Sequence, residues 1–191
     1  MAGPISRSGS GDAGYTTGLV GKWHLGNEVY AQHGFQEWVS IEDIYSEHFG
    51  AGQDPQRRSS YHGFLESQGY KPDNRKENKF SRGFAVRVPL HHCKPQFLAR
   101  EASRFILDNR QTPWLLHVNF LEPHMPFFGP LNDLHSEQEA PVPRNYPGDQ
   151  VDHEPELYRK IRQGFLEKGF EKQDLRTRAG WQRLNRNYAG L

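Results

Sequence analysis

The sequence predicts an α/β fold in which a mostly parallel β-sheet is flanked by helices. Three successive segments carry this prediction: an apolar strand over residues 15–21, an amphipathic helix over 96–109 and a second apolar strand over 114–120. A strand, a crossover helix and a further strand in this order are typical of a parallel sheet.

The first strand combines apolar and β-branched residues and ends at Gly21. A turn over 22–26 follows it, and residues 27–89 are aromatic, rich in glycine and without regular periodicity, so we expect irregular structure there. Within that segment, the polar residues 71–79 predict a surface loop. The small polar residues 1–13 are interpreted as a disordered or remnant segment.

The crossover helix opens at Pro95, and its apolar residues recur at helical spacing. The residues expected on its inward face are Leu98, Ala102, Phe105 and Ile106. Thr112 and Pro113 end this helix, and the near-continuous apolar run of the second strand predicts burial on both faces.

Residues 123–155 are rich in proline and show no periodicity, whereas two helices are predicted after them. The first covers Glu156–Lys168, and its inward residues are expected to be Leu157, Ile161 and Phe165. The second starts near Asp174 and carries an apolar stripe of Leu175, Ala179, Leu184, Tyr188 and Leu191.

Composition limits the classes of function. The 191 residues are enough for one domain with a hydrophobic core. With 24 basic and 23 acidic residues, the chain has no overall charge that would attract nucleic acid or a membrane surface. A single cysteine excludes a disulfide framework and a cysteine-rich zinc site. No segment approaches the roughly 20 apolar residues of a membrane span, and the first residues lack the apolar stretch of a signal peptide.

Polar side chains that suit an anion follow both predicted strands. Lys22 and His24 come directly after the first strand, and His124 follows the second. Ligands of open α/β sheets bind beyond the carboxyl ends of the strands, so parallel strands would bring these three residues to one edge. Taken singly, each of them is better explained as a solvated lysine or as a capping or packing histidine. Together they favour an anion site.

Several motifs, in order, resemble the sulfatase family. Residues 14–26, GYTTGLVGKWHLG, look like the family's second signature, and residues 119–130, NFLEPHMPFFGP, resemble its P-H-x-P segment. Residues 33–38 are similar to the G-F-D stretch that follows the lysine motif, and residues 187–191 resemble the start of the family's Y-x7-D helix. This resemblance implies an alkaline-phosphatase-like fold, with residues 14–191 forming part of a sulfatase catalytic domain.

The resemblance also implies a chemistry. Sulfatases hydrolyse sulfate esters of small molecules or glycans through a formylglycine hydrate beside a bound Ca²⁺. Lys22 would hold a sulfate oxygen, and His24 would hydrogen-bond the formylglycine hydroxyl and assist the release of sulfate. His124 would contact the bridging oxygen and protonate the leaving alcohol. Relatives are often periplasmic, secreted or lysosomal; the localisation and oligomeric state of this chain stay open.

Three elements of the family pattern are not found in the sequence. The nucleophile motif C-x-P-S-R and the first metal aspartates precede the lysine motif in the family, and a later Asp-Asn pair follows the helix at Tyr188. We therefore expect an internal fragment without turnover on its own, and we assign no metal ligand. Cys93 begins a C-x-P sequence, but Phe97 stands where arginine is required, so Cys93 is interpreted as a packing residue. The pairs at 73–74 and 108–109 are each followed by arginine, not the expected glycine, and neither follows a strand.

Two alternatives remain at this point. The same scaffold supports hydrolysis of phosphonates or phosphate monoesters, because sulfate and phosphate differ mainly in charge. A non-catalytic module that binds anions or glycans would also preserve the pocket residues.

Overall fold

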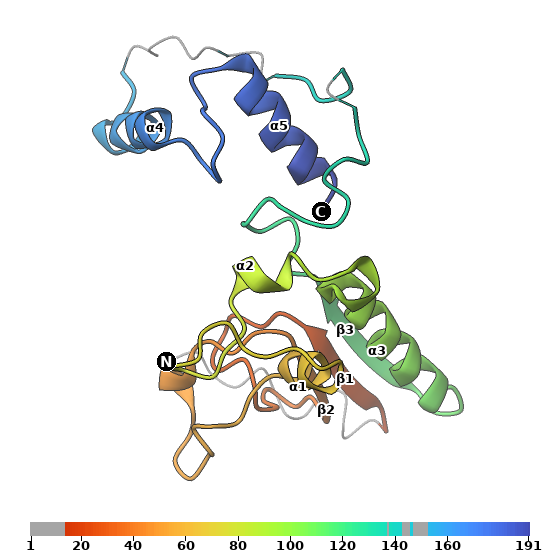
Figure 1. The fold of residues 1–191 in the computed structure, drawn as a ribbon. Coiled ribbons are helices and arrows are strands. Elements are labelled where there is room, and N and C mark those ends of the chain that lie inside the picture. The colour runs from red at the N-terminus through yellow and green to blue at the C-terminus, as the bar shows by residue number, and fades with distance from the viewer. Residues whose placement is uncertain (1–13, 137, 143–145, 147–152) are drawn as a thin grey trace. The chain divides into compact units, whose positions relative to one another are not determined.

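The computed structural model describes residues 14–136, 138–142, 146 and 153–191 (Figure 1). The chain divides into two units, Met1–Glu122 and Pro123–Leu191, and each is described by itself. The segment 1–13, predicted to be disordered or a remnant, lies outside the described residues.

The first unit is built on a three-stranded sheet in the order β2-β1-β3, with all pairs parallel. Its strands are β1 (Thr16–Gly21), β2 (Glu37–Ser40) and β3 (Trp114–Asn119). The register places Gly21 opposite Ser40 on one side and Asn119 on the other. The predicted α/β class and the parallel relation of the first and last strands are confirmed, and β1 is the central strand.

The expectation of irregular structure over residues 27–89 is partly wrong, because β2 lies there. Its four residues are too few for alternation to stand out in the sequence, and the second edge of β1 supplies their hydrogen bonds. Two helices also occur in this segment, α1 (Ser60–Ser67) and α2 (Arg82–Ala85). The loop over 71–79 is largely exposed, as predicted.

Serine caps start both of these helices. The side chain of Ser59 accepts a hydrogen bond from the backbone N–H of His62 at 3.2 Å, and Ser81 accepts one from Phe84 at 3.1 Å. Such caps satisfy backbone donors that a first helical turn leaves unpaired. Short 3-10 turns occupy Ser46–His48 and Leu90–His92.

The crossover helix α3 spans Lys94–Asp108 and packs on β1, in agreement with the prediction. Gly18 permits the close approach, because a Cβ atom there would lie 2.5 Å from the Phe105 ring. Leu98 and Phe105 are buried as expected, but Ile106 is 40% exposed. Ile106 lies about 80° around the helix from Leu98, which places it off the buried stripe.

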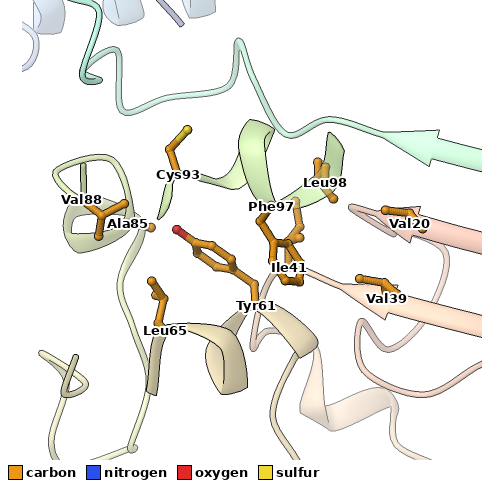
Figure 2. Close-up of a cluster of buried hydrophobic side chains, with 10 residues drawn as sticks. All are labelled: Val20, Val39, Ile41, Tyr61, Leu65, Ala85, Val88, Cys93, Phe97 and Leu98. Atoms are coloured by element: carbon orange, nitrogen blue, oxygen red, sulfur yellow. The ribbon is translucent and has the colours of Figure 1, made fainter. Parts of the chain in front are cut away.

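The core of the first unit lies between the sheet, α1 and α3 (Figure 2). Its buried residues are Val20, Val39, Ile41, Tyr61, Leu65, Ala85, Val88, Cys93, Phe97 and Leu98. The hydroxyl of Tyr61 donates to the backbone oxygen of His92 at 2.9 Å, so its polar end is satisfied within this apolar cluster.

The prediction that the second strand is buried on both faces is wrong for the described structure. α3 packs against one face of the sheet, where Leu116 contacts the core cluster. On the opposite face Leu115 is 45% exposed. β3 is the outer strand of the described sheet, so an apolar run alone did not reveal which face is covered.

In the second unit, α4 (Glu156–Lys168) confirms the predicted helix but not its predicted inward face. Leu157, Ile161 and Phe165 are all at least 41% exposed. Helical periodicity identifies an apolar face but not what covers it. In the described part of the chain, no helix is long and apolar enough to cross a membrane.

The last helix, α5 (Arg178–Ala189), starts four residues after Asp174, the predicted start. Thr177 sets this start, because its hydroxyl accepts a hydrogen bond from the N–H of Gly180 at 3.0 Å. The predicted apolar stripe is only partly buried, since Ala179 and Tyr188 are exposed. The residues of α5 that are buried are Gly180, Leu184, Arg186 and Asn187.

Candidate active site

The end of β1 is held firmly against β3. The N–H of Lys22 donates to the backbone oxygen of Asn119 at 3.0 Å, and the Asn119 amide donates to the backbone oxygen of Lys22 at 3.1 Å. Gly21 has a φ of +137°, and a Cβ atom there would overlap the backbone oxygen of Asn119. The position therefore requires glycine, and it lies directly before Lys22 at the carboxyl end of β1.

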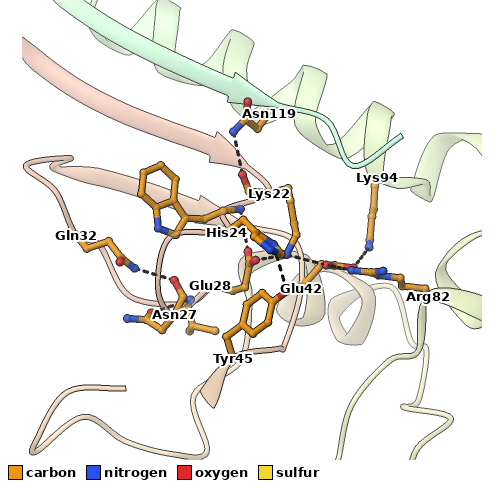
Figure 3. Close-up of polar contacts among 12 residues, drawn as sticks. Lys22, His24, Asn27, Glu28, Gln32, Glu42, Tyr45, Arg82, Lys94 and Asn119 are labelled. Atoms are coloured by element: carbon orange, nitrogen blue, oxygen red, sulfur yellow. Dashed lines mark hydrogen bonds and ion pairs between the residues drawn. The ribbon is translucent and has the colours of Figure 1, made fainter. Parts of the chain in front are cut away.

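Lys22 meets two protein carboxylates (Figure 3). Its Nζ contacts Oε1 of Glu28 directly and lies 3.1 Å from Oε2 of Glu42. The ammonium also lies 5.0 Å from the centre of the Tyr45 ring, within range of a cation–π interaction. The lysine that the sequence predicts to hold an anion is therefore surrounded by acceptors from its own chain.

Glu42 is the centre of this charge cluster. Arg82 grips it with two hydrogen bonds, 2.6 Å from Nε to Oε1 and 2.7 Å from Nη2 to Oε2, and Nζ of Lys94 lies 3.2 Å from Oε1. Burial alone would raise the pKa of Glu42, but the Arg82 hydrogen bonds and the charges of Lys94, Arg82 and Lys22 lower it to about 2. Glu42 is therefore ionised at neutral pH.

At Glu28, the effect of burial on the pKa outweighs the effect of the hydrogen bonds. This residue is fully buried, and burial raises its pKa although Lys22 and the backbone N–H of Trp23 both donate to it. Burial also lowers the pKa of Lys94, against the attraction of Glu42. Lys22, Arg82 and Lys94 thus share the carboxylates of Glu28 and Glu42, and the charge of Glu122 also acts on Lys94.

His24 is exposed beside this cluster. Its Nδ1 lies 3.2 Å from the hydroxyl of Tyr45, and the two rings meet edge to face with centres 5.2 Å apart. Nε2 has no hydrogen-bond partner among the residues that the structure describes. Tyr45 thus orients the imidazole and also borders the Lys22 ammonium, and it joins the two residues into one site.

His124, the third predicted residue, belongs to the second unit, where Nδ1 lies 2.7 Å from the backbone oxygen of Met125. Because the two units are described separately, its convergence with Lys22 and His24 stays a prediction.

Cys93 precedes α3 and lies in the hydrophobic core, as its interpretation as a packing residue expects. Burial raises the pKa of its thiol. A thiol in this state is a poor nucleophile, because the thiolate is the reactive form.

The carboxylates of the site do not fit a calcium ion. Ca²⁺ takes about six or more oxygen ligands, whereas Glu28 and Glu42 are held by Lys22, Arg82 and Lys94, whose charges repel a cation. Within the described ranges, no group of three or more His, Cys, Asp or Glu residues is arranged to hold a metal ion.

Five residues of the site were not predicted from the sequence: Glu28, Glu42, Tyr45, Arg82 and Lys94. They are spread over 67 positions with no characteristic spacing, and only the fold brings them together. A weak signal existed at Glu42, an acidic residue next to the buried Ile41, where a charge is costly unless it is paired.

A family model described as Sulfatase matches residues 11–180, which include all three strands and the residues Lys22, His24 and His124. A search of curated proteins found no match.

Proposed function

Because the chain belongs to the sulfatase family of sulfuric ester hydrolases, we propose that it binds a sulfate ester at the carboxyl end of β1. The observation that carries this proposal is that Lys22 and His24 both contact Tyr45, which brings the ammonium and the imidazole together at this edge. Parallel α/β sheets bind ligands at this edge, and β1 is the central strand.

Lys22 is proposed to hold a sulfate oxygen. Its ammonium is a compact charge with three donors, and the carboxylates of Glu28 and Glu42 now accept from it. A sulfate oxygen would take over part of this coordination. Glu28 is the carboxylate more easily displaced, because burial already disfavours its charged form.

The two histidines are proposed to handle protons and hydroxyl groups. His24, held through Nδ1 by Tyr45, presents Nε2 to the hydroxyl of the nucleophile and assists the release of sulfate. His124 protonates the leaving alcohol. The nucleophile is proposed to be a formylglycine hydrate, a role that is not assigned to Cys93.

Isothermal titration with an aryl sulfate tests this proposal. Lys22→Ala is expected to weaken binding about tenfold or more, because it removes the charge that meets the sulfate. The matched control Lys71→Ala removes an exposed lysine that belongs to neither proposed anion site and should bind like the wild type.

His24→Ala provides a second arm, because this exposed side chain can be removed without leaving a buried charge unpaired. It should weaken binding while the circular dichroism spectrum stays unchanged. Wild-type affinity in both Lys22→Ala and His24→Ala would contradict the proposal. Tighter binding of an aryl phosphate than of the aryl sulfate would favour the phosphatase alternative instead.

A further inference from the structure

A hollow of about 270 Å³ lies in the first unit, apart from Lys22 and His24. Two polar turns, over residues 54–58 and 74–79, form one side of it, and Val29, Ile44 and Phe49 contribute apolar surface. Tyr45 turns away towards Lys22, while its neighbours Ile44 and Ser46 line the hollow. This hollow and the candidate active site therefore lie against the same segment but do not share a charged side chain.

Arg58 is fixed between the two turns. Its guanidinium donates to the backbone oxygens of Asn78 at 3.0 Å and Glu77 at 2.9 Å, to those of Pro55 and Arg57, and to the side-chain oxygen of Gln56, which uses all five of its N–H groups. These acceptors are neutral carbonyls, and no carboxylate of the described residues pairs with Arg58. Its position is thus set while its charge stays uncompensated.

Two more cations of the hollow also lack a carboxylate partner within the described residues. The Arg57 guanidinium stacks on the Tyr30 ring, 4.5 Å from its centre, and Lys76 is exposed. The acidic lining residues are already occupied: Asp43 by His62 at 2.7 Å, and Glu77 by Lys79 at 3.5 Å. The lining residues carry four cations and two carboxylates and hence a net charge of +2.

We propose that this hollow is a second anion-binding site, which takes a tetrahedral oxyanion group such as sulfate or phosphate. Arg57 lies on one turn and Lys76 on the other, so donors from two separate segments face the anion. The guanidinium of Arg57 matches an oxygen pair of such a group, and Arg58, whose own N–H groups are used within the chain, contributes a fixed positive charge. The site is independent of the function proposed for Lys22.

Amide chemical shifts of the ¹⁵N-labelled chain, titrated with inorganic sulfate and separately with phosphate, test this site. Saturable shifts are expected at residues 56–58 and 76–79, and they should persist in Lys22→Ala. The arm with the larger shifts at lower concentration identifies the preferred oxyanion. Acetate should shift these amides less, and an equal response to acetate would overturn the assignment to a tetrahedral group.

The double variant Arg57→Gln/Lys76→Gln should weaken oxyanion binding about tenfold, since each exposed ion pair is individually weak. It keeps Arg58, which ties the turns together, so the fold should survive. The matched control Arg110→Gln/Arg178→Gln removes two exposed arginines elsewhere and should bind like the wild type. Equal weakening in both double variants, or no saturable shifts in the wild type, would overturn the proposal.

Discussion

Gly21→Ala should destabilise the first unit by about 3 kcal/mol or more, because it combines backbone strain with a steric overlap. Alanine rarely adopts a φ of +137°, and its Cβ would overlap the backbone oxygen of Asn119. Relief of this overlap must separate the ends of β1 and β3, where Lys22 and Asn119 exchange hydrogen bonds. The variant should therefore lose both stability in urea unfolding and affinity for an aryl sulfate.

Gly63→Ala is the matched control for that substitution. Gly63 lies within α1, and a Cβ atom there would meet nothing within 4 Å. Alanine in a helix is more favourable than glycine by roughly 0.5–1 kcal/mol, so this control should be neutral or stabilising. If Gly21→Ala unfolds at the same urea concentration as Gly63→Ala, the close contact between Gly21 and the backbone of Asn119 does not contribute to stability as described.

Glu42→Gln is expected to cost about 3 kcal/mol of folding free energy, since the buried ammonium of Lys94 loses the carboxylate that it pairs with. Lys94 is 6% exposed, and among the described residues Glu42 is the carboxylate that forms an ion pair with it, while Glu122 acts on it only through its charge. Arg82 is about one-third exposed and recovers part of its hydration, which keeps the expected loss near the lower end for buried pairs. Glu47→Gln, an exposed residue without an ion pair among the described residues, should change the stability little.

The stabilisation from Glu42 should also depend on pH. Its pKa is about 2 in the folded chain, against an ordinary value of 4.5, so folding favours the ionised carboxylate. The stabilisation is therefore complete above pH 4.5 and is lost as the pH falls towards 2. Glu28 acts in the opposite sense, because burial raises its pKa. Protonation in acid therefore removes the free-energy cost of burying its charged carboxylate.

The difference in unfolding free energy between the wild type and Glu42→Gln isolates the Glu42 contribution, since other carboxylates titrate in both proteins. This difference should be large near neutral pH and should shrink below about pH 4. A difference that stays constant down to about pH 3 would contradict the charge cluster around Glu42.

Long apolar segments were the most predictable part of the fold. β1, α3 and β3 carry enough consecutive periodic residues for the parallel unit to be predicted. β2 and α1 were missed, because a four-residue strand and an eight-residue helix contain little periodicity. β2 forms because the edge of β1 pairs with it, and α1 packs its apolar residues into the core. Both depend on tertiary contacts that the local sequence does not show.

The candidate site was predictable only where a motif is continuous in the sequence. Lys22 and His24 stand two residues apart after a clear strand, so their position could be inferred. Glu42, Arg82 and Lys94 come from separate segments, and their long-range pairing leaves no local pattern. The occupation of Lys22 by two carboxylates was likewise beyond sequence reasoning.

Sulfate ester binding at the end of β1 is tested most directly by the aryl sulfate affinity of Glu28→Gln, measured by titration beside the wild type. The neutral amide keeps an oxygen for the N–H of Trp23 but no longer competes with the sulfate for Lys22 or repels it. The affinity should therefore rise about tenfold, and the added substitution Lys22→Ala should abolish the gain. An affinity equal to or below that of the wild type would show that the ester does not bind beside Lys22.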